Sequence, residues 1–390
     1  MQKCPKQCIK MVKDEQGFLY PETDTDPCIQ CGLCESVCPV LNKGVEHEPI
    51  GVYAAKNKNE AERYQSSSGG VYCLLANSIL VQGGVVFGVR FDDKWQAVHS
   101  YIETKGDLGL FMGSKYVQSR TENTFAITQD FLKKGRPVLY SGTPCQIAGL
   151  KNFLGKEYEG LLTIEVLCHG VPSPRVWEDY LDSIRRPKGA AAGENTVLSS
   201  LNDAPSIEGI SFRDKQNGWR KYGFVVRFSA DQREAGKFGL SSVKAKIEKR
   251  EYHKDNLYMK AFLNNLCLRP SCFECPSKGG KSKADISLGD FWSMKKHCPD
   301  FDDNKGVTLV YLNSDKGVSA FQELDCDYRA LERNVNYNRM FAGHSCERYP
   351  VGKFWEKYNQ YGIECVPSIV SSMQPSFIIR IIKRIQAIFK

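Results

Sequence analysis

Four cysteines, Cys28, Cys31, Cys34 and Cys38, lie in the run CIQCGLCESVCP at residues 28–39. Their spacing, C-x2-C-x2-C-x3-C followed by proline, is that of bacterial ferredoxins, in which thiolates on a tight loop ligate an iron–sulfur cluster. Zinc sites usually come as separated C-x2-C pairs instead. The run therefore predicts a 4Fe-4S cluster and chemistry that moves single electrons.

The first three cysteines of this run need a fourth ligand from elsewhere, because in two-cluster ferredoxins the last cysteine of each run ligates the other cluster. The N-terminal segment KCPKQCIKM offers Cys4, which with Pro5 resembles the end of another ferredoxin run. We predict Cys4 as the fourth ligand and interpret the missing upstream cysteines as a truncated start. Cys8 and Cys38 are then spare, and a local four-ligand site that includes Cys38 is the alternative.

A second set of thiolates comes from three separate segments. Cys145 in SGTPCQ follows the apolar segment PVLY and enters a helix, whereas Cys168 ends the strand-like segment TIEVL. Cys272 and Cys275 form a C-x2-C pair in RPSCFEC, with Cys267 as a substitute ligand. Four thiolates can hold a second 4Fe-4S cluster, which we favour because an electron-transfer chain needs a relay. Zinc on the same four residues is the alternative.

Cys145 also has a different interpretation, as a nucleophile with His169 as its base. A thiolate at a helix N-terminus has a lowered pKa, which suits such a role. The sequence identifies no oxyanion hole and no orienting asparagine to complete this site. We therefore prefer the iron–sulfur interpretation of Cys145.

A phosphate-binding site is predicted at SSSGG, residues 66–70, which precedes a helix. Small residues let the backbone approach a ligand, and the amides of a helix N-terminus bind anions. We interpret Ser67, Ser68, Gly69 and Gly70 as contacts to the pyrophosphate of FAD, the alternative being a plain helix cap. The segment does not match G-x-G-x-x-G, so it is not a Rossmann fingerprint.

Two further motifs supply candidate flavin contacts. Lys115 and Tyr116 lie in GSKYVQS, where a lysine can stabilise anionic charge on a flavin and an aromatic ring can stack on it. Asp290 in GDFW follows a strand and can accept a hydrogen bond from a cofactor ring or ribose, with Trp292 packed against it. The alternatives are a solvated lysine and a turn with a core aromatic pair.

Other polar groups receive structural interpretations. We expect Asp214 and Lys215 in FRDK to form a surface ion pair, which contributes little to stability. We expect Cys73 in GGVYCLLA to pack in the core.

The composition is typical of a globular protein and predicts a cytoplasmic location with metal sites. The chain has 390 residues, 42% of them hydrophobic and 25% charged, enough for two or three domains. Its 16 cysteines cluster in C-x2-C units, which indicates metal ligation in a reducing compartment. No apolar leader and no membrane-spanning stretch are present. The net charge of +8 suits anionic cofactors, and without a nucleic-acid motif we expect no nucleic-acid partner.

Strands alternate with helices between residues 66 and 184, which favours an α/β (α+β) main domain with a mixed sheet and functional groups on the loops after strands. Residues 186–205 are interpreted as a flexible insertion. In residues 210–228, ISFRDKQNGWRKYGFVVRF, apolar and polar residues alternate, which predicts a β-hairpin. Residues 241–266 look helical, and residues 283–292 and 306–313 read as strands.

The C-terminal segment FIIRIIKRIQAIFK, residues 377–390, interleaves isoleucine with basic residues. In a helix, Ile378, Ile381, Ile385 and Ile388 share one face. Such a helix can bind the surface of an anionic membrane. Docking on the body of the protein or on a partner is the alternative.

Seven motifs occur in a fixed order from residue 66 to residue 292: SSSGGV, GSKYVQS, SGTPCQIAGL, CHGVPSP, FRDK-x3-W, RPSCFEC and DISLGDFW. This order resembles the coenzyme F-420 hydrogenase/dehydrogenase beta-subunit family, with a ferredoxin-type module in front, and covers most of residues 1–320. The resemblance implies FAD and iron–sulfur clusters that exchange electrons with a deazaflavin or a similar hydride carrier. Many family members come from bacteria not expected to make coenzyme F-420, some near surface-polysaccharide genes.

We therefore predict a cytoplasmic iron–sulfur flavoprotein oxidoreductase in which a hydride is exchanged at FAD and electrons reach a redox partner protein through the two clusters. The alternative is an electron-transfer or zinc or iron–sulfur scaffold subunit without flavin. Catalytic residues are not assigned. The predicted divisions are a ferredoxin-type module over 1–42, a flavin domain over 50–330 and a helical C-terminal region over 331–390.

Overall fold

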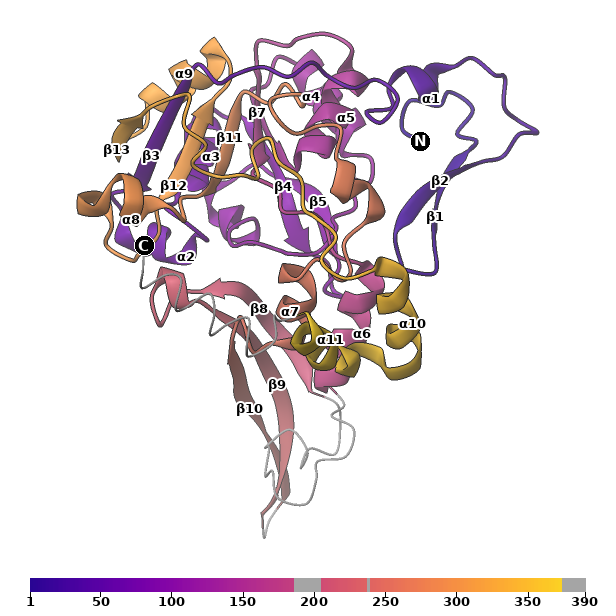
Figure 1. The fold of residues 1–390 in the computed structure, drawn as a ribbon, viewed down its shortest axis with the longest axis vertical. Coiled ribbons are helices and arrows are strands. Elements are labelled where there is room, and N and C mark those ends of the chain that lie inside the picture. Colours follow the sequence, from indigo (N-terminus) through magenta and orange to yellow (C-terminus); the bar gives the residue numbers. More distant parts are fainter. Residues whose placement is uncertain (186–204, 237–238, 374–390) are drawn as a thin grey trace, which may run out of the picture.

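The structure, a computed structural model, describes residues 1–185, 205–236 and 239–373 (Figure 1). Its centre is an eight-stranded mixed sheet of order β13-β3-β12-β11-β7-β6-β4-β5, in which β11, β7, β6 and β4 run parallel and the others antiparallel to their neighbours. This confirms the predicted α/β class with a mixed sheet. The strands are β3 (Gly51–Asn57), β4 (Val85–Phe91), β5 (Ala97–Ile102), β6 (Val138–Gly142), β7 (Leu161–Val166), β11 (Ile286–Asp290), β12 (Thr308–Leu312) and β13 (Cys326–Leu331).

Alternate residues of these strands face opposite layers of helices. Val86 and Leu139 pack with the helices α3 (Val71–Val81) and α9 (Asp315–Gln322), whereas Val85 and Val138 pack on the other face. That second face is covered by α4 (Thr124–Lys133) and α5 (Pro144–Leu154). Central strands buried on both faces read as continuous apolar runs, such as TLVYL in β12.

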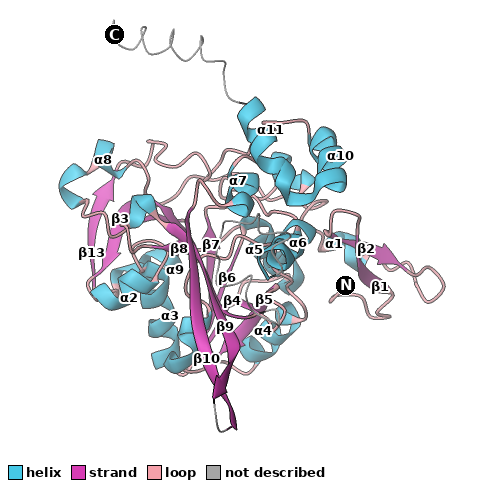
Figure 2. Cartoon of the chain, turned by 90° about the horizontal axis from the view of Figure 1, so that it is seen from below, coloured by secondary structure: helices cyan, strands magenta, loops and turns pink. Residues whose placement is uncertain are grey.

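A second, three-stranded sheet projects from the body, and Figure 2 shows β9 and β10 as a long ribbon. It contains β8 (Ser206–Asp214), β9 (Gly223–Gly236) and β10 (Gly239–Tyr252). The helix expected over residues 241–266 is therefore wrong, because β10 pairs with β9 along its whole length and only α7 (Leu257–Leu263) is helical there. Ile247 lies opposite Phe228, and this apolar cross-strand pair joins the core beneath the sheet.

The three-stranded sheet packs on a core rich in aromatic residues beside the central sheet. Trp177 of α6 (Pro174–Arg185) is fully buried in this core. The helices α10 (Val351–Tyr361) and α11 (Val366–Ser372) cover the same core, with Phe354 buried in it. The expected insertion and the amphipathic C-terminal segment lie outside the described residues, apart from residue 205 of the insertion. In the described part of the chain, no helix is both long and apolar enough to cross a bilayer.

The N-terminal module is a hairpin of β1 (Ile9–Lys13) and β2 (Leu19–Thr23), followed by the short helix α1 (Leu33–Ser36). It lies beside the body (Figure 1), and long-range hydrogen bonds connect the two. Arg269 donates to the Leu19 carbonyl at 2.9 Å, and Arg175 donates to the Glu15 carbonyl at 3.0 Å. Gly17 has a positive φ of 85°, and a Cβ there would lie 2.6 Å from the Arg175 backbone nitrogen, so only glycine allows this approach.

Glu165 is a buried carboxyl in β7 that accepts hydrogen bonds from the Ser282 and Ser287 hydroxyls. Burial raises its pKa to about 6 from an ordinary 4.5. Because the folded pKa lies above the unfolded one, the stability that this group contributes is present below pH 4.5 and is lost as the pH rises through about 6.

We therefore expect Glu165→Gln, which stays neutral, to gain stability relative to the parent protein above pH 6, by on the order of 2 kcal/mol. Urea unfolding at pH 4.5 and pH 8 measures this difference. The exposed Glu159→Gln is the matched control and should show no such change. An equal stability difference for Glu165→Gln at both pH values would contradict the prediction.

Candidate functional site

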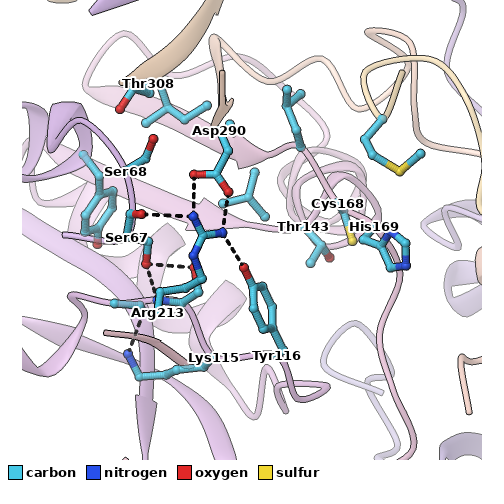
Figure 3. Close-up of a pocket in the computed structure, with 18 of the residues that line it drawn as sticks. Ser67, Ser68, Lys115, Tyr116, Thr143, Cys168, His169, Arg213, Asp290 and Thr308 are labelled. Carbon is cyan, nitrogen blue, oxygen red and sulfur yellow. Dashed lines mark hydrogen bonds and ion pairs between the residues drawn. The ribbon is translucent and has the colours of Figure 1, made fainter. Parts of the chain in front are cut away.

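A cavity of about 650 Å³ opens where the parallel strands β6, β7 and β11 reach their carboxyl ends. Ligands of open α/β sheets bind at this edge, because the loops that follow the strands converge there. Figure 3 shows the polar residues that line the cavity, with Arg213 at its centre and Cys168 and His169 farther along. Of the seven predicted cofactor contacts, six line this cavity: Ser67, Ser68, Gly70, Lys115, Tyr116 and Asp290.

Gly69, the seventh, lies behind the lining. Its N–H donates to the Thr308 hydroxyl at 3.0 Å, and a Cβ at Gly69 would lie 2.4 Å from the Ala55 carbonyl oxygen. Only glycine therefore lets this loop pass so close to β3 and β12. Gly70 has a φ of 85° and begins the eleven-residue helix α3, and Ser67 accepts hydrogen bonds from both the amide and the hydroxyl of Ser114.

Arg213 is the functional residue that sequence reasoning missed. Its guanidinium donates to Asp290 Oδ2 at 2.7 Å and to the Tyr116 hydroxyl at 3.1 Å, and its side chain is only 2% exposed. It also stacks over the rings of Tyr222 and Trp292 at 4.2 and 4.8 Å. Its Nε is buried and has no hydrogen-bond partner among the described residues. The only local signal was an arginine at the end of an alternating strand.

Lys115 and Tyr116 have different surroundings within the cavity. Burial lowers the pKa of Lys115 to about 8, and its Nζ donates to the Met112 carbonyl at 3.1 Å. The Tyr116 ring stacks on Phe262 at 4.9 Å, so its hydroxyl rather than its face points toward Arg213 (Figure 3).

The surface pair expected between Asp214 and Lys215 does not form. Asp214 pairs with Arg250 instead, whereas Lys215 is buried beneath residues 66–70, which we call the serine loop. Its Nζ donates to three backbone carbonyls, and burial, together with the charges of Arg63 and Arg213, lowers its pKa to about 7. The alternating pattern around FRDK gave no sign that β8 ends inside the protein.

The second thiolate set gathers at the far end of the cavity. Cys145 lies in the first turn of α5, which a capping box and a proline begin, and Cys168 follows β7 and lines the cavity. Cys272 lies in the 3-10 helix Pro270–Glu274, and Cys275 follows that helix directly. The Val171 amide donates to Cys272 Sγ at 3.4 Å.

Burial and mutual repulsion act together on the thiols of this set. Burial, with repulsion from Cys145 and Cys275, raises the pKa of Cys272 to about 11, and burial with repulsion from Cys272 and Cys145 raises the pKa of Cys168. An all-sulfur donor set with amide donors nearby fits an iron–sulfur cluster or zinc. Even so, across residues 1–185, 205–236 and 239–373, no three metal-ligating side chains are arranged to hold an ion. Cys267 instead lies in the aromatic core, and Cys73 is buried as expected.

Among the N-terminal thiols, Cys8 lies in contact with predicted cluster ligands. Cys4 Sγ lies 3.3 Å from Cys8 Sγ, and contact with Cys4, burial and the nearby Cys28 raise the pKa of Cys8 to about 11. Cys8, which we expected to be spare, therefore lies between two of the predicted ligands. Cys31 is exposed and Cys34 and Cys38 are half-buried, so this arrangement does not choose between Cys4 and Cys38.

In the hydrolase interpretation, the base His169 has an orienting partner, but the nucleophile Cys145 is not hydrogen-bonded to that base. His169 Nε2 lies 2.6 Å from Asn265 Oδ1, an orienting asparagine that the sequence did not reveal. Among the described residues, however, the Cys145 thiol is hydrogen-bonded to Thr143 at 3.2 Å and not to His169. The nucleophile and the base of such a site are therefore not paired.

Comparisons with known proteins agree with this architecture. Residues 135–333 match the family defined by the C terminus of the coenzyme F420 hydrogenase/dehydrogenase beta subunit, and residues 21–41 match a 4Fe-4S binding domain. The first match covers about half of the chain, so the chain belongs to the coenzyme F420 hydrogenase/dehydrogenase beta-subunit family. The resemblance seen in the sequence and the N-terminal iron–sulfur module are thereby confirmed, and both support oxidoreductase-type electron transfer.

Two individual relatives are similar to the chain. An uncharacterized protein of Methanocaldococcus jannaschii is 30% identical over 139 residues, which are 33% of this chain and 38% of that protein. The match thus spans well under half of that relative. A chain of the F420-reducing NiFe hydrogenase complex from Methanosarcina barkeri superposes with a TM-score of 0.42 at 14% identity, covering 84% of this chain and 94% of that chain.

Proposed function

We propose that the chain is a flavin-dependent iron–sulfur oxidoreductase that passes electrons between a hydride carrier, FAD, two 4Fe-4S clusters and a redox partner. The observation that carries the proposal is the single cavity with two chemically different ends. One end presents Ser67, Lys115 and Arg213, which suit an anionic cofactor, and the other reaches the thiol of Cys168.

The first end fits a flavin dinucleotide. The cavity of about 650 Å³ lies within the usual range for cofactor sites. The N-terminus of α3 and the ammonium of Lys115 favour a pyrophosphate, and the unpartnered Nε of Arg213 is a donor without an acceptor. A flavin bound there would exchange a hydride in one direction and single electrons in the other.

The proposed electron path follows from the position of the thiolates. Cys145, Cys168, Cys272 and Cys275 would hold the cluster beside the flavin. The N-terminal module, with Cys28, Cys31, Cys34 and Cys4 as ligands, would pass electrons to a partner. The name of the family makes a deazaflavin the first candidate for the hydride carrier. All sixteen cysteines are free, which supports a reducing, cytoplasmic location.

Lys115→Met tests the flavin end of the cavity. We expect the dissociation constant of FAD to rise about tenfold or more, because a half-buried cation that lines the cavity is lost. Titration of anaerobically purified, flavin-depleted protein, followed by quenching of flavin fluorescence, measures this constant. The control is the exposed Lys94→Met on the turn after β4. If the parent protein neither contains nor takes up flavin, the chain is an electron-transfer subunit without flavin and the proposal fails.

A further inference from the structure

The ammonium of Lys215 lies in a cage of three backbone carbonyls below the cavity floor. Its Nζ donates to Arg63 O at 2.7 Å, to Ser68 O at 2.8 Å and to Lys305 O at 3.0 Å. The side chain is buried, only 5% exposed. An ammonium has three donors, and here each of them has one acceptor at an ordinary hydrogen-bond distance.

The three carbonyls come from two regions of the chain that are distant in sequence, one around residues 63–68 and the other at Lys305. Arg63 belongs to α2 (Glu60–Gln65), Ser68 to the serine loop, and Lys305 to the loop before β12. Nearby bonds tie the same segments together, since Arg63 donates to Asp303 and to the Gly306 carbonyl. Lys215 itself follows β8, so one side chain joins the projecting sheet to α2, to the serine loop after it and to the loop before β12.

The cage also fixes how the serine loop meets the cavity. The Ser67 carbonyl accepts from Trp219 Nε1 at 3.2 Å, and the next carbonyl, that of Ser68, accepts from Lys215. The N–H that follows, at Gly69, donates to the Thr308 hydroxyl at 3.0 Å. The carbonyls of Ser67 and Ser68 are therefore both occupied by protein donors, and the Ser68 hydroxyl donates to the Val307 carbonyl at 2.7 Å. This leaves the Ser67 hydroxyl and the α3 N-terminus to face the ligand space.

We propose that Lys215 is a positioning residue whose ammonium acts as a built-in monovalent cation and holds the serine loop in its anion-binding shape. Carbonyl cages of this kind bind potassium or ammonium ions in other proteins, and here the side chain supplies the ion. The inference rests on the proposed function for its ligand. The shape of the loop, however, can be measured without any ligand.

Lys215→Ala removes the ammonium and leaves the cage empty. We expect hydrogen–deuterium exchange of the amides in residues 63–70 of the flavin-depleted protein to rise tenfold or more, measured at pH 6 where the parent Lys215 is protonated. The dissociation constant of FAD should rise by a similar factor. Ammonium chloride at 200 mM should restore much of both effects, whereas tetramethylammonium chloride, which is too large for the cage, should not.

Two further variants make the outcome decisive. Lys221→Ala removes an exposed lysine from the same segment and should change neither readout. Lys215→Met keeps the volume of the stem without the charge, so it repeats the exchange test if Lys215→Ala does not fold. Unchanged exchange in residues 63–70, or loss of folding in both Lys215 variants, would overturn the positioning role. If the parent protein bound no FAD, the proposed function would be wrong. The exchange measurement, which needs no ligand, would still test the role of Lys215.

Discussion

Anaerobically isolated protein is expected to carry about eight irons and eight acid-labile sulfides, because two separate sets of four thiolates each suit one 4Fe-4S cluster. Cys272→Ser should remove the cluster of the body and leave about four irons in the N-terminal module. Cys31→Ser should do the reverse, and the double variant should hold almost no iron. Iron and sulfide analysis, with electron paramagnetic resonance of the reduced protein, measures both sets.

The matched control is Cys346→Ser, which removes an exposed thiol that lies outside both sets. If the parent protein contained zinc together with only about four irons and four sulfides, the second set would hold zinc instead of a cluster. Full iron content in Cys272→Ser would show that this thiolate is not a ligand.

The same measurement separates the candidates for the fourth N-terminal ligand. We predict that Cys4→Ala loses the N-terminal cluster and that Cys38→Ala keeps it. Cys8→Ala belongs in this series, because Cys8 lies against Cys4 and beside Cys28. Loss of the cluster in Cys8→Ala with retention in Cys4→Ala would exchange their assigned roles.

Arg213→Met is expected to lower the free energy of unfolding by about 3–5 kcal/mol, because it leaves the Asp290 carboxylate without its partner in a largely buried site. Asp290→Leu should cost a similar amount, since the Arg213 side chain is only 2% exposed. The double variant Arg213→Met with Asp290→Leu should recover most of the loss, because it leaves neither charge unpaired. Urea unfolding of flavin-depleted protein under argon measures all three.

An exposed ion pair provides the control for this series. Lys13 and Glu178 lie 2.9 Å apart with side chains 55% and 41% exposed, so Lys13→Met should cost less than about 1 kcal/mol. The double variant at Arg213 and Asp290 should regain stability without regaining FAD binding, which separates the two roles of the arginine. Additive losses in the double variant would show that the pair contributes nothing as a pair.

The architecture of the central sheet could be predicted because its signals are local. The segment around Cys145 shows an apolar strand, then threonine and proline at the start of a helix, and the structure has β6 and the capping box of α5 at these residues. Helix caps and buried strand runs are encoded within about ten residues, so one sequence suffices to find them. The same holds for the ferredoxin run, whose ligands are neighbours in the chain.

The missed features depend on partners far away in the sequence. Lys215 looks solvated until the carbonyls of Ser68 and Lys305 surround it, and Arg213 has no visible partner until β11 brings Asp290 to it. Residues 241–266 looked helical, because nothing local reveals the pairing of β10 with β9. Sequence reasoning therefore failed where a residue's environment depends on segments far away in the chain, through a buried charge or through strand pairing.

The separation between the ligands of each thiolate set also determines when each site can form during synthesis. The N-terminal ligands are complete once Cys34 has left the ribosome, whereas the body set waits for Cys275. At roughly 5–20 residues per second, tens of seconds separate these two events. Arg269, which anchors the hairpin of the module, also emerges only at the end of this interval. On the proposed assignment, the first cluster can be loaded on a nascent chain before its docking surface exists, and the second only on an almost finished one.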